Sequence, residues 1–118
     1  MIIDYYLKNE AEQFDYIKIP MALVKEETFA PLSSQTKILY GLLLDKMRES
    51  TKKNWIDDDN HVFVIYPVEE IQHDMGMSKR KVIDSLTELN DIGLICKRRQ
   101  GRGNPNLIYV KNYASTQV

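Results

Sequence analysis

The stretch PVEEIQHDMGMSKRKVIDSLTELNDIG, residues 67–93, decides the fold. Pro67 suits the first position of a short helix, and Gly76 is the residue type that ends a helix in a left-handed conformation. Ser78 is a good N-cap for a second, longer helix over residues 78–92, whose apolar side chains recur at helical spacing. Helix, tight turn and helix together predict a helix-turn-helix. Any two packed helices give a similar pattern, so the next segment has to distinguish this motif.

The segment after Gly93 predicts a two-stranded hairpin. Residues 94–99 and 107–111 favour β-structure, and the polar loop QGRGNPN at 100–106 joins them. Two strands joined by a basic, glycine-rich loop directly after a helix-turn-helix form a wing. The sequence therefore predicts an α+β fold, a winged helix-turn-helix with an additional β-hairpin and an N-terminal extension.

A long helix is predicted before this motif, over residues 34–50. Leu39, Leu43 and Met47 recur there at helical spacing, and serines that can cap the helix precede them. Gly41 lies inside this helix at a cost of about 1 kcal/mol relative to alanine. We therefore expect another element to pack closely against the helix at this glycine.

Two weaker β signals lie on either side of the long helix. Residues 14–19 form a short β-like run that ends at Pro20, which fits an edge strand or an extended lead-in. After the helix, residues 53–56 and 62–66 are β-prone and are separated by the turn-forming residues 57–60. This second pattern predicts the additional hairpin.

The length of 118 residues fits one domain. We expect an N-terminal arm and lead-in strand at 1–31, the winged-helix domain at 32–113 and the start of a linker at 114–118. The N-terminus lacks the basic start and long apolar run of a signal peptide, and no apolar run approaches transmembrane length. These features predict a cytoplasmic protein without a membrane partner.

Disulfides, metals, cofactors and catalysis are not expected. The single Cys96 has no partner for an intrachain disulfide, and with His61 and His73 it gives no zinc spacing. The acidic triplet 57–59 lacks the ligand spacing of an EF-hand. No phosphate-binding loop of the P-loop type and no nucleophile with a paired base is visible. Cys96 lies in an apolar stretch and is expected in the core.

The charge of the chain is divided by position. The total is −1, but residues 1–77 carry 8 basic and 14 acidic side chains, net −6, whereas residues 78–118 carry 8 basic and 3 acidic ones, net +5. Such asymmetry indicates a surface for an anionic partner. An ordinary solvated charged face is the alternative.

The second helix of the motif has an outward face that can read bases. Arg80 can pair with guanine, Lys81 can contact guanine or phosphate, and Asp84 can accept from cytosine. Ser78, Lys79 and the first-turn N–H groups are better placed for phosphate. A merely solvated helix start is the alternative.

The wing supplies a second set of basic and amide side chains around two glycines. The imperfect alternation of residues 94–99 leaves open which arginine points to DNA, and a hairpin tip that is merely soluble is the alternative. The residues expected to contact DNA on both elements are Ser78, Lys79, Arg80, Lys81, Asp84, Arg98, Arg99, Arg102, Asn104 and Asn106.

Nearly the whole chain resembles the N-terminal domain of the replication initiators of Gram-positive multiresistance plasmids, the staphylococcal RepA type. The stretches that carry the resemblance are FDYIKIPMAL at 14–23, LSSQTKILYGLLLDKM at 32–47, NWID at 54–57, VFVIYPVEEI at 62–71, and LNDIGLI at 89–95 with the downstream QGRGNPNLIYV. One departure is Asn60-His61 at the hairpin tip, where relatives often have glycine. Asn also tolerates positive φ, so the turn is expected to be retained.

The resemblance implies a winged-helix homodimer that binds repeats, or iterons, in double-stranded DNA at a plasmid origin and starts replication with host factors. DNA contacts would fall on residues 78–81 and 98–106. Members of the family are longer, with a linker and a C-terminal domain concerned with host proteins, so the chain is expected to be a fragment. A winged-helix transcription regulator and a winged helix that docks on replication proteins stay open as alternatives.

Overall fold

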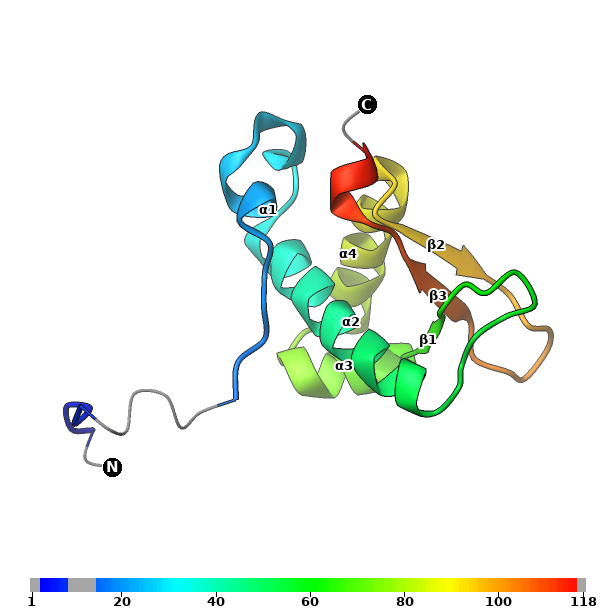
Figure 1. The fold of residues 1–118 in the computed structure, drawn as a ribbon, viewed down its shortest axis with the longest axis horizontal. Helices are drawn as coiled ribbons and strands as arrows, with labels where there is room; N and C mark the ends of the chain where they lie inside the picture. The colour runs from blue at the N-terminus through cyan, green and yellow to red at the C-terminus, as the bar shows by residue number, and fades with distance from the viewer. Residues whose placement is uncertain (1–2, 9–14, 117–118) are drawn as a thin grey trace.

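The computed structural model describes residues 3–8 and 15–116 of the chain (Figure 1). Its elements in chain order are α1 (Met21–Lys25), the 3₁₀ turn η1 (Glu27–Phe29), α2 (Ser34–Lys52), β1 (Val64–Ile65), α3 (Val68–Met75), α4 (Lys79–Ile92), β2 (Ile95–Arg98), β3 (Leu107–Val110) and the 3₁₀ turn η2 (Tyr113–Thr116). Within the described residues, no helix combines the length and apolarity that crossing a membrane requires.

The helix-turn-helix forms where the sequence predicts it. α3 ends at Gly76, whose φ of 61° is the left-handed conformation that glycine adopts without strain. The Ser78 side chain caps α4 by accepting a hydrogen bond from the N–H of Lys81 at 3.2 Å, and Gly93 ends α4 with φ 90°. Pro67 differs from the expectation, because it is the N-cap of α3 and not its first helical residue.

Three short strands form one antiparallel sheet in the order β1-β3-β2. β2 pairs with β3 through Cys96 opposite Tyr109 and Lys97 opposite Ile108, so β2 and β3 are the strands of the predicted wing. Directly opposed residues share a face of the sheet. Lys97 and Ile108 therefore face the helices, whereas Cys96 and Tyr109 lie on the outer face.

Helices α2 and α4 bury their apolar faces against the inner face of this sheet, and α3 packs against α4. The largest fully buried side chains include Leu39, Tyr40 and Leu43 of α2, Ile71 of α3, Val82 and Leu89 of α4, and Val64 and Ile95 of the sheet. Leu23 and Phe29 from α1 and η1 join the same core. Cys96 is half-buried on the outer face, because the alternation of β2 sends Ile95 into the core instead.

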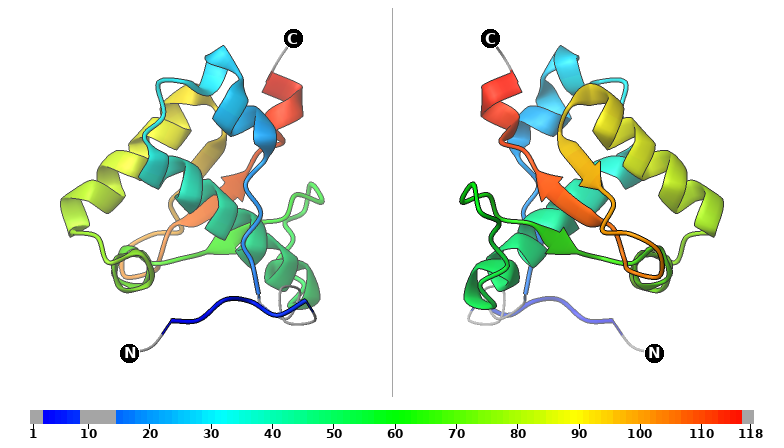
Figure 2. Two further views of the ribbon diagram at one scale, coloured as in Figure 1. Left: turned by 90° about the vertical axis from the view of Figure 1, so that its left-hand side faces the viewer. Right: turned by 90° about the vertical axis from the view of Figure 1, so that its right-hand side faces the viewer.

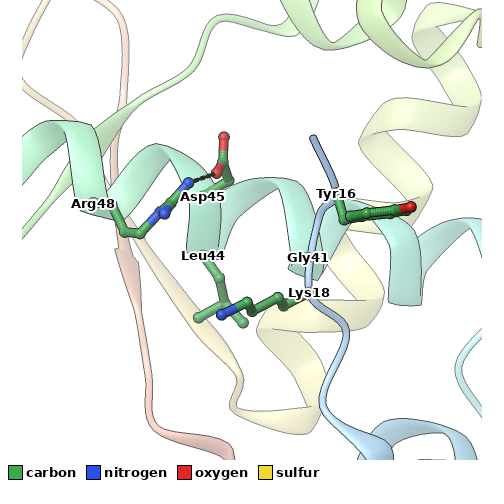
Figure 3. A pocket seen from close by; sticks show the side chains of 6 residues that line it. All are labelled: Tyr16, Lys18, Gly41, Leu44, Asp45 and Arg48. Atoms are coloured by element: carbon green, nitrogen blue, oxygen red, sulfur yellow. Dashed lines mark hydrogen bonds and ion pairs between the residues drawn. The ribbon is translucent and has the colours of Figure 1, made fainter. Parts of the chain in front are cut away.

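The expected close approach at Gly41 is confirmed. The extended chain at Lys18 and Ile19 crosses α2 at this glycine, as the side chains around it show (Figure 3). A Cβ at Gly41 would lie 3.0 Å from Cγ1 of Ile19 and 3.2 Å from the carbonyl oxygen of Lys18. Residues 15–19 are extended but belong to none of the described strands, so the lead-in alternative fits and the edge strand does not; Phe14 lies outside the described residues.

The additional hairpin is shorter than the sequence predicts. The single bridge Ile56–Val62 joins its two arms, because Val64 and Ile65 pair instead with β3. Asp57 Oδ1 organises the tip by accepting from the N–H groups of Asp59 at 3.0 Å and His61 at 2.9 Å. Asn60 takes φ 66°, so the residue that replaces glycine does adopt the left-handed conformation.

Candidate nucleic-acid interface

The outward face of α4 carries polar side chains, as its helical periodicity predicts. Val82 and Leu89 have no exposed surface, and Leu86 is 4% exposed, so these residues define the face turned to the core. The residues that the helical wheel directs outward are Arg80, Lys81, Asp84, Thr87 and Asp91, and all five are exposed. The predicted direction of the helix face is thus confirmed.

The first turn of α4 is an unneutralised positive surface. Lys79, Arg80 and Lys81 are exposed, and within the described part of the chain none of them forms an ion pair. Ser78 uses one oxygen lone pair for the cap, and its hydroxyl proton stays available to an external acceptor. The helix dipole adds partial positive charge at the same place, so this end of α4 favours a phosphate.

A groove of about 510 Å³ lies between the wing and the starts of α3 and α4. Lys79 of α4, Lys97 of β2 and the amides Asn104 and Asn106 of the wing loop line it, together with Glu69 of α3. Figure 2 shows the wing loop beside α3. The fold thus brings Lys79 of the predicted helix contacts together with Asn104 and Asn106 of the predicted wing contacts in one concave surface. Arg80 and Asp84 line a separate depression on α4, which Lys79 also borders.

Lys97 belongs to this groove although it is absent from the predicted contact residues. Lys97 pairs with Ile108 and so shares the inner face of the sheet with it, whereas the next residue, Arg98, lies on the outer face. Lys97 shares this face with the buried Ile95 two residues earlier, because side chains two apart along a strand share a face. The sequence alone does not identify the face, because the adjacent Leu94 is also apolar and is also buried.

Arg98 lies on the other face of the sheet from the groove. Its guanidinium carbon is 5.1 Å from the centre of the Tyr109 ring, a cation–π distance. Tyr109 also makes an edge contact with His61. The structure therefore does not bring Arg98 together with the α4 residues, and it places this arginine behind the wing.

The wing loop presents its remaining basic residues to solvent. Arg99 and Arg102 are exposed and, among the described residues, form no ion pair. The side-chain amide Nε2 of Gln100 donates to the carbonyl oxygen of Pro105 at 2.9 Å, which closes the base of the loop. Gly101 has φ 116°, a conformation that bulkier residues adopt only with strain.

Glu88 has a structural partner that the sequence does not reveal. Its Oε1 accepts from the backbone N–H of Ser33 at 3.0 Å, and its Oε2 accepts from the hydroxyl of Thr36 at 3.0 Å. The carboxylate sits at the N-terminus of α2, where the helix dipole favours negative charge. This contact fixes the orientation of α4, and hence of its outward face, relative to α2.

A second polar contact orients α3. The Tyr66 hydroxyl donates to Oδ2 of Asp74, and the Lys46 ammonium lies 5.0 Å from the centre of the Tyr66 ring. This hydrogen bond holds the pKa of Asp74 below its ordinary value, and burial raises the pKa of Tyr66. The contact connects α3 to the residue that follows β1, so the start of the helix-turn-helix is tied to the sheet.

No metal site is found among the described residues, because no group of three or more His, Cys, Asp or Glu side chains there has the spacing to hold an ion. The polar side chains that line the groove include those of Lys79, Lys97, Asn104 and Asn106, which can donate hydrogen bonds, and the carboxylate of Glu69. Such donors recognise phosphate oxygens and base edges.

Family comparison agrees with this architecture. Residues 15–118 match the family described as the N-terminus of replication initiator protein A, RepA. The chain belongs to the RepA N-terminal family. The resemblance seen in the sequence is confirmed, and the matched residues of this RepA-type domain include both the helix-turn-helix and the wing.

One curated relative of the RepA-type domain is the "41 kDa protein" of Lactobacillus helveticus. The two are 30% identical over 96 residues, which make up 81% of this chain and 26% of the relative. The RepA-type domain therefore spans about a quarter of that relative's length.

Two solved structures have the same fold as this RepA-type domain. One, described as the N-terminal domain of a DNA-binding protein, is 25% identical with a TM-score of 0.77 and covers 94% of this chain and 85% of its own. The other, described as the structure of a Rep–DNA complex, is 26% identical with a TM-score of 0.77 and covers 92% and 84%. The predicted α+β winged helix-turn-helix is thus confirmed.

Proposed function

We propose that this domain binds double-stranded DNA sequence-specifically at repeats in a plasmid replication origin and so helps to initiate replication. The observation that carries the proposal is the groove in which Lys79, Lys97, Asn104 and Asn106 converge beside the unpaired basic turn of α4. Membership of the RepA N-terminal family supports the same function. Among similar structures, the one described as a Rep–DNA complex supports DNA as the partner.

In this proposal the outward face of α4 enters the major groove with its N-terminal end first. Arg80, Lys81 and Asp84 contact base edges, because they are exposed in the first two turns of the helix. Ser78 and Lys79 contact phosphate and fix the register without reading sequence.

The wing follows the adjacent backbone or minor groove. Arg99, Arg102, Asn104 and Asn106 are exposed in its loop, so they are the wing residues that we assign to DNA. Lys97 joins them through the groove. Arg98 acts from behind by packing on Tyr109, and its contribution is to hold the hairpin in shape.

The charge distribution orients the encounter. The surface of residues 78–118 has a net charge of +5, and the remainder of the chain has −6. Because DNA attracts the first and repels the second, approach through the helix and wing is favoured.

The biological unit that we propose is a homodimer in the cytoplasm, on two half-sites with recognition helices about 34 Å apart. The exposed apolar side chains Ile3, Tyr5 and Leu7 of the N-terminal arm support self-association. We place the arm and lead-in at 1–31, the DNA-binding unit at 32–113 and the start of a linker at 114–118. Contacts with host replication proteins are assigned to sequence beyond this domain, since the chain spans 26% of the curated relative.

Footprinting on the origin of the encoding plasmid tests the proposal. The chain should protect repeated duplex sites, and its affinity for them should fall steeply as salt is added, because phosphate contacts release counterions. Protection at a promoter with none at the origin would assign the domain to transcription control. Binding of equal strength to all sequences, unchanged when Arg80 and Arg102 are both reversed to glutamate, would leave protein docking as the function.

A further inference from the structure

The outward face of α4 contains a large apolar side chain among charged ones. Ile83 is 41% exposed, and it lines an open depression with Lys79, Arg80 and Asp84. The core face of the same helix is formed by Val82 and its buried neighbours, and Ile83 is not part of that core.

Single exposed apolar residues are common on protein surfaces and carry no meaning by themselves. The position of Ile83 within the helix is what distinguishes it. Ile83 follows Arg80 by three residues and precedes Thr87 by four, so the three side chains form one stripe along the exposed surface of α4. This stripe begins at the basic turn, which is the end that we direct into the major groove.

An isoleucine side chain has no hydrogen-bonding group, so it can distinguish bases only by apolar contact. In the major groove, thymine alone among the four bases presents a methyl group, at C5. A stripe of arginine, isoleucine and threonine therefore combines a guanine-type donor with surfaces that suit a methyl group.

We propose that Ile83 is a specificity-determining residue that selects thymine by contact with its 5-methyl group. The inference rests on the proposed function, since it requires α4 to lie in the major groove. Three residues of helix advance about 4.5 Å, and base pairs are spaced by about 3.4 Å. Because these two distances are comparable, we expect the selected thymine at or beside the base pair that Arg80 contacts.

Replacement of thymine by deoxyuridine tests this directly, because deoxyuridine pairs identically and lacks only the methyl group. A duplex is first selected by the wild-type chain from a randomised library, and each thymine in it is then replaced singly by deoxyuridine. Binding of wild type and Ile83→Ala is measured on every duplex. Ile38→Ala is the matched control, because Ile38 is 40% exposed on α2, outside the recognition helix.

The expected result is one position where loss of the methyl weakens wild-type binding by about fourfold, the equivalent of one buried methyl group at ~0.8 kcal/mol. At that position Ile83→Ala should be indifferent to the replacement, whereas Ile38→Ala should behave as wild type. Thermal unfolding of both variants confirms that they are folded.

Wild-type binding that tolerates deoxyuridine at every position would overturn the role of Ile83 and leave the proposed function intact. The same holds if Ile83→Ala keeps the full sensitivity to deoxyuridine. Failure of the library to yield any preferred duplex would instead contradict the proposed function itself. These outcomes are therefore distinguishable in one experiment.

Discussion

Oε1 of Glu88 accepts a hydrogen bond from the backbone N–H of Ser33 at 3.0 Å, across 55 residues of sequence. One helix of the domain thereby caps another, and the helix that provides the cap is the one proposed to read DNA.

Glu88→Ala should lower the free energy of unfolding by ~1–2 kcal/mol, because it removes a charge-assisted cap and leaves the N–H of Ser33 without this acceptor. The unfolding free energy of Glu88→Gln should lie between those of wild type and Glu88→Ala, because the single carbonyl oxygen of glutamine replaces only one of the two carboxylate acceptors. Denaturant titration measures the loss. Asp91→Ala, an exposed acidic residue on the same helix, should change stability little, and an equal loss in that control would contradict the capping role.

Arg80→Ala should relax sequence preference at one base pair by about 1–3 kcal/mol, because a bidentate contact to guanine is lost. The measurement is binding to a set of duplexes with each base pair substituted in turn. Lys79→Ala provides the control, since the loss of a phosphate contact should weaken binding to all duplexes by the same factor. If Arg80→Ala also weakens every duplex by the same factor, Arg80 contacts phosphate.

Arg102→Ala and Arg98→Ala form a matched pair in the wing. Arg102→Ala should weaken binding to all sequences and reduce the slope of log affinity against log salt by about 1, because one phosphate contact is lost. Arg98→Ala should leave that slope unchanged and reduce stability by ~0.5–1 kcal/mol through loss of the contact with Tyr109. DNA-binding titrations at several salt concentrations measure these slopes. Equal slopes for the two variants would contradict the assignment of Arg102 to DNA contact and of Arg98 to packing.

Gly41→Leu should displace the lead-in from α2, because even a Cβ there would lie 3.0 Å from Cγ1 of Ile19. We expect a loss of ~1–3 kcal/mol from overpacking and faster cleavage by trypsin after Lys18. Gln35→Leu, an exposed position on the same helix, is the control. An unchanged cleavage rate in Gly41→Leu would show that the crossing contributes nothing to the order of the lead-in.

Tyr66→Phe should remove a pH-dependent part of the stability. The pKa of Asp74 is lowered by the Tyr66 hydroxyl, so this contact stabilises the fold above the ordinary pKa of an aspartate and loses its effect as pH falls through the lowered value. The difference in unfolding free energy between wild type and Tyr66→Phe should therefore be constant near neutrality and shrink below about pH 4. A difference that grows on acidification would be inconsistent with the lowered pKa.

Local signals account for the parts of the fold that the sequence predicts. Gly76, Ser78 and Gly93 begin or end helices through contacts with residues close to them in sequence. The end of α3 and both ends of α4 can therefore be predicted from the local sequence alone. The apolar periodicity of residues 34–50 predicts α2, observed at Ser34–Lys52, because this signal too is local in sequence. The outward face of α4, and with it most of the candidate helix contacts, follows directly from this periodicity.

The sequence does not identify which residues become partners when they are distant from one another in the chain. The register of β2 with β3 decides that Lys97 faces the groove and Arg98 does not, and the pairing of Val64 with Ile108 shortens the additional hairpin. α1 is five residues long and has no periodicity to read, and its place depends on the burial of Leu23. The site is therefore predictable as two segments, but not as the surface that they form together.

The bond from Gln100 to Pro105 has a kinetic consequence for recognition. A loop that becomes ordered only on contact with its partner loses conformational entropy during binding, and this loss disfavours the complex. Because this hydrogen bond already closes the base of the wing loop in the free protein, less of that entropy remains to be lost when the wing binds. Association should then be governed by diffusion and charge, and differences between sites should be expressed as differences in residence time.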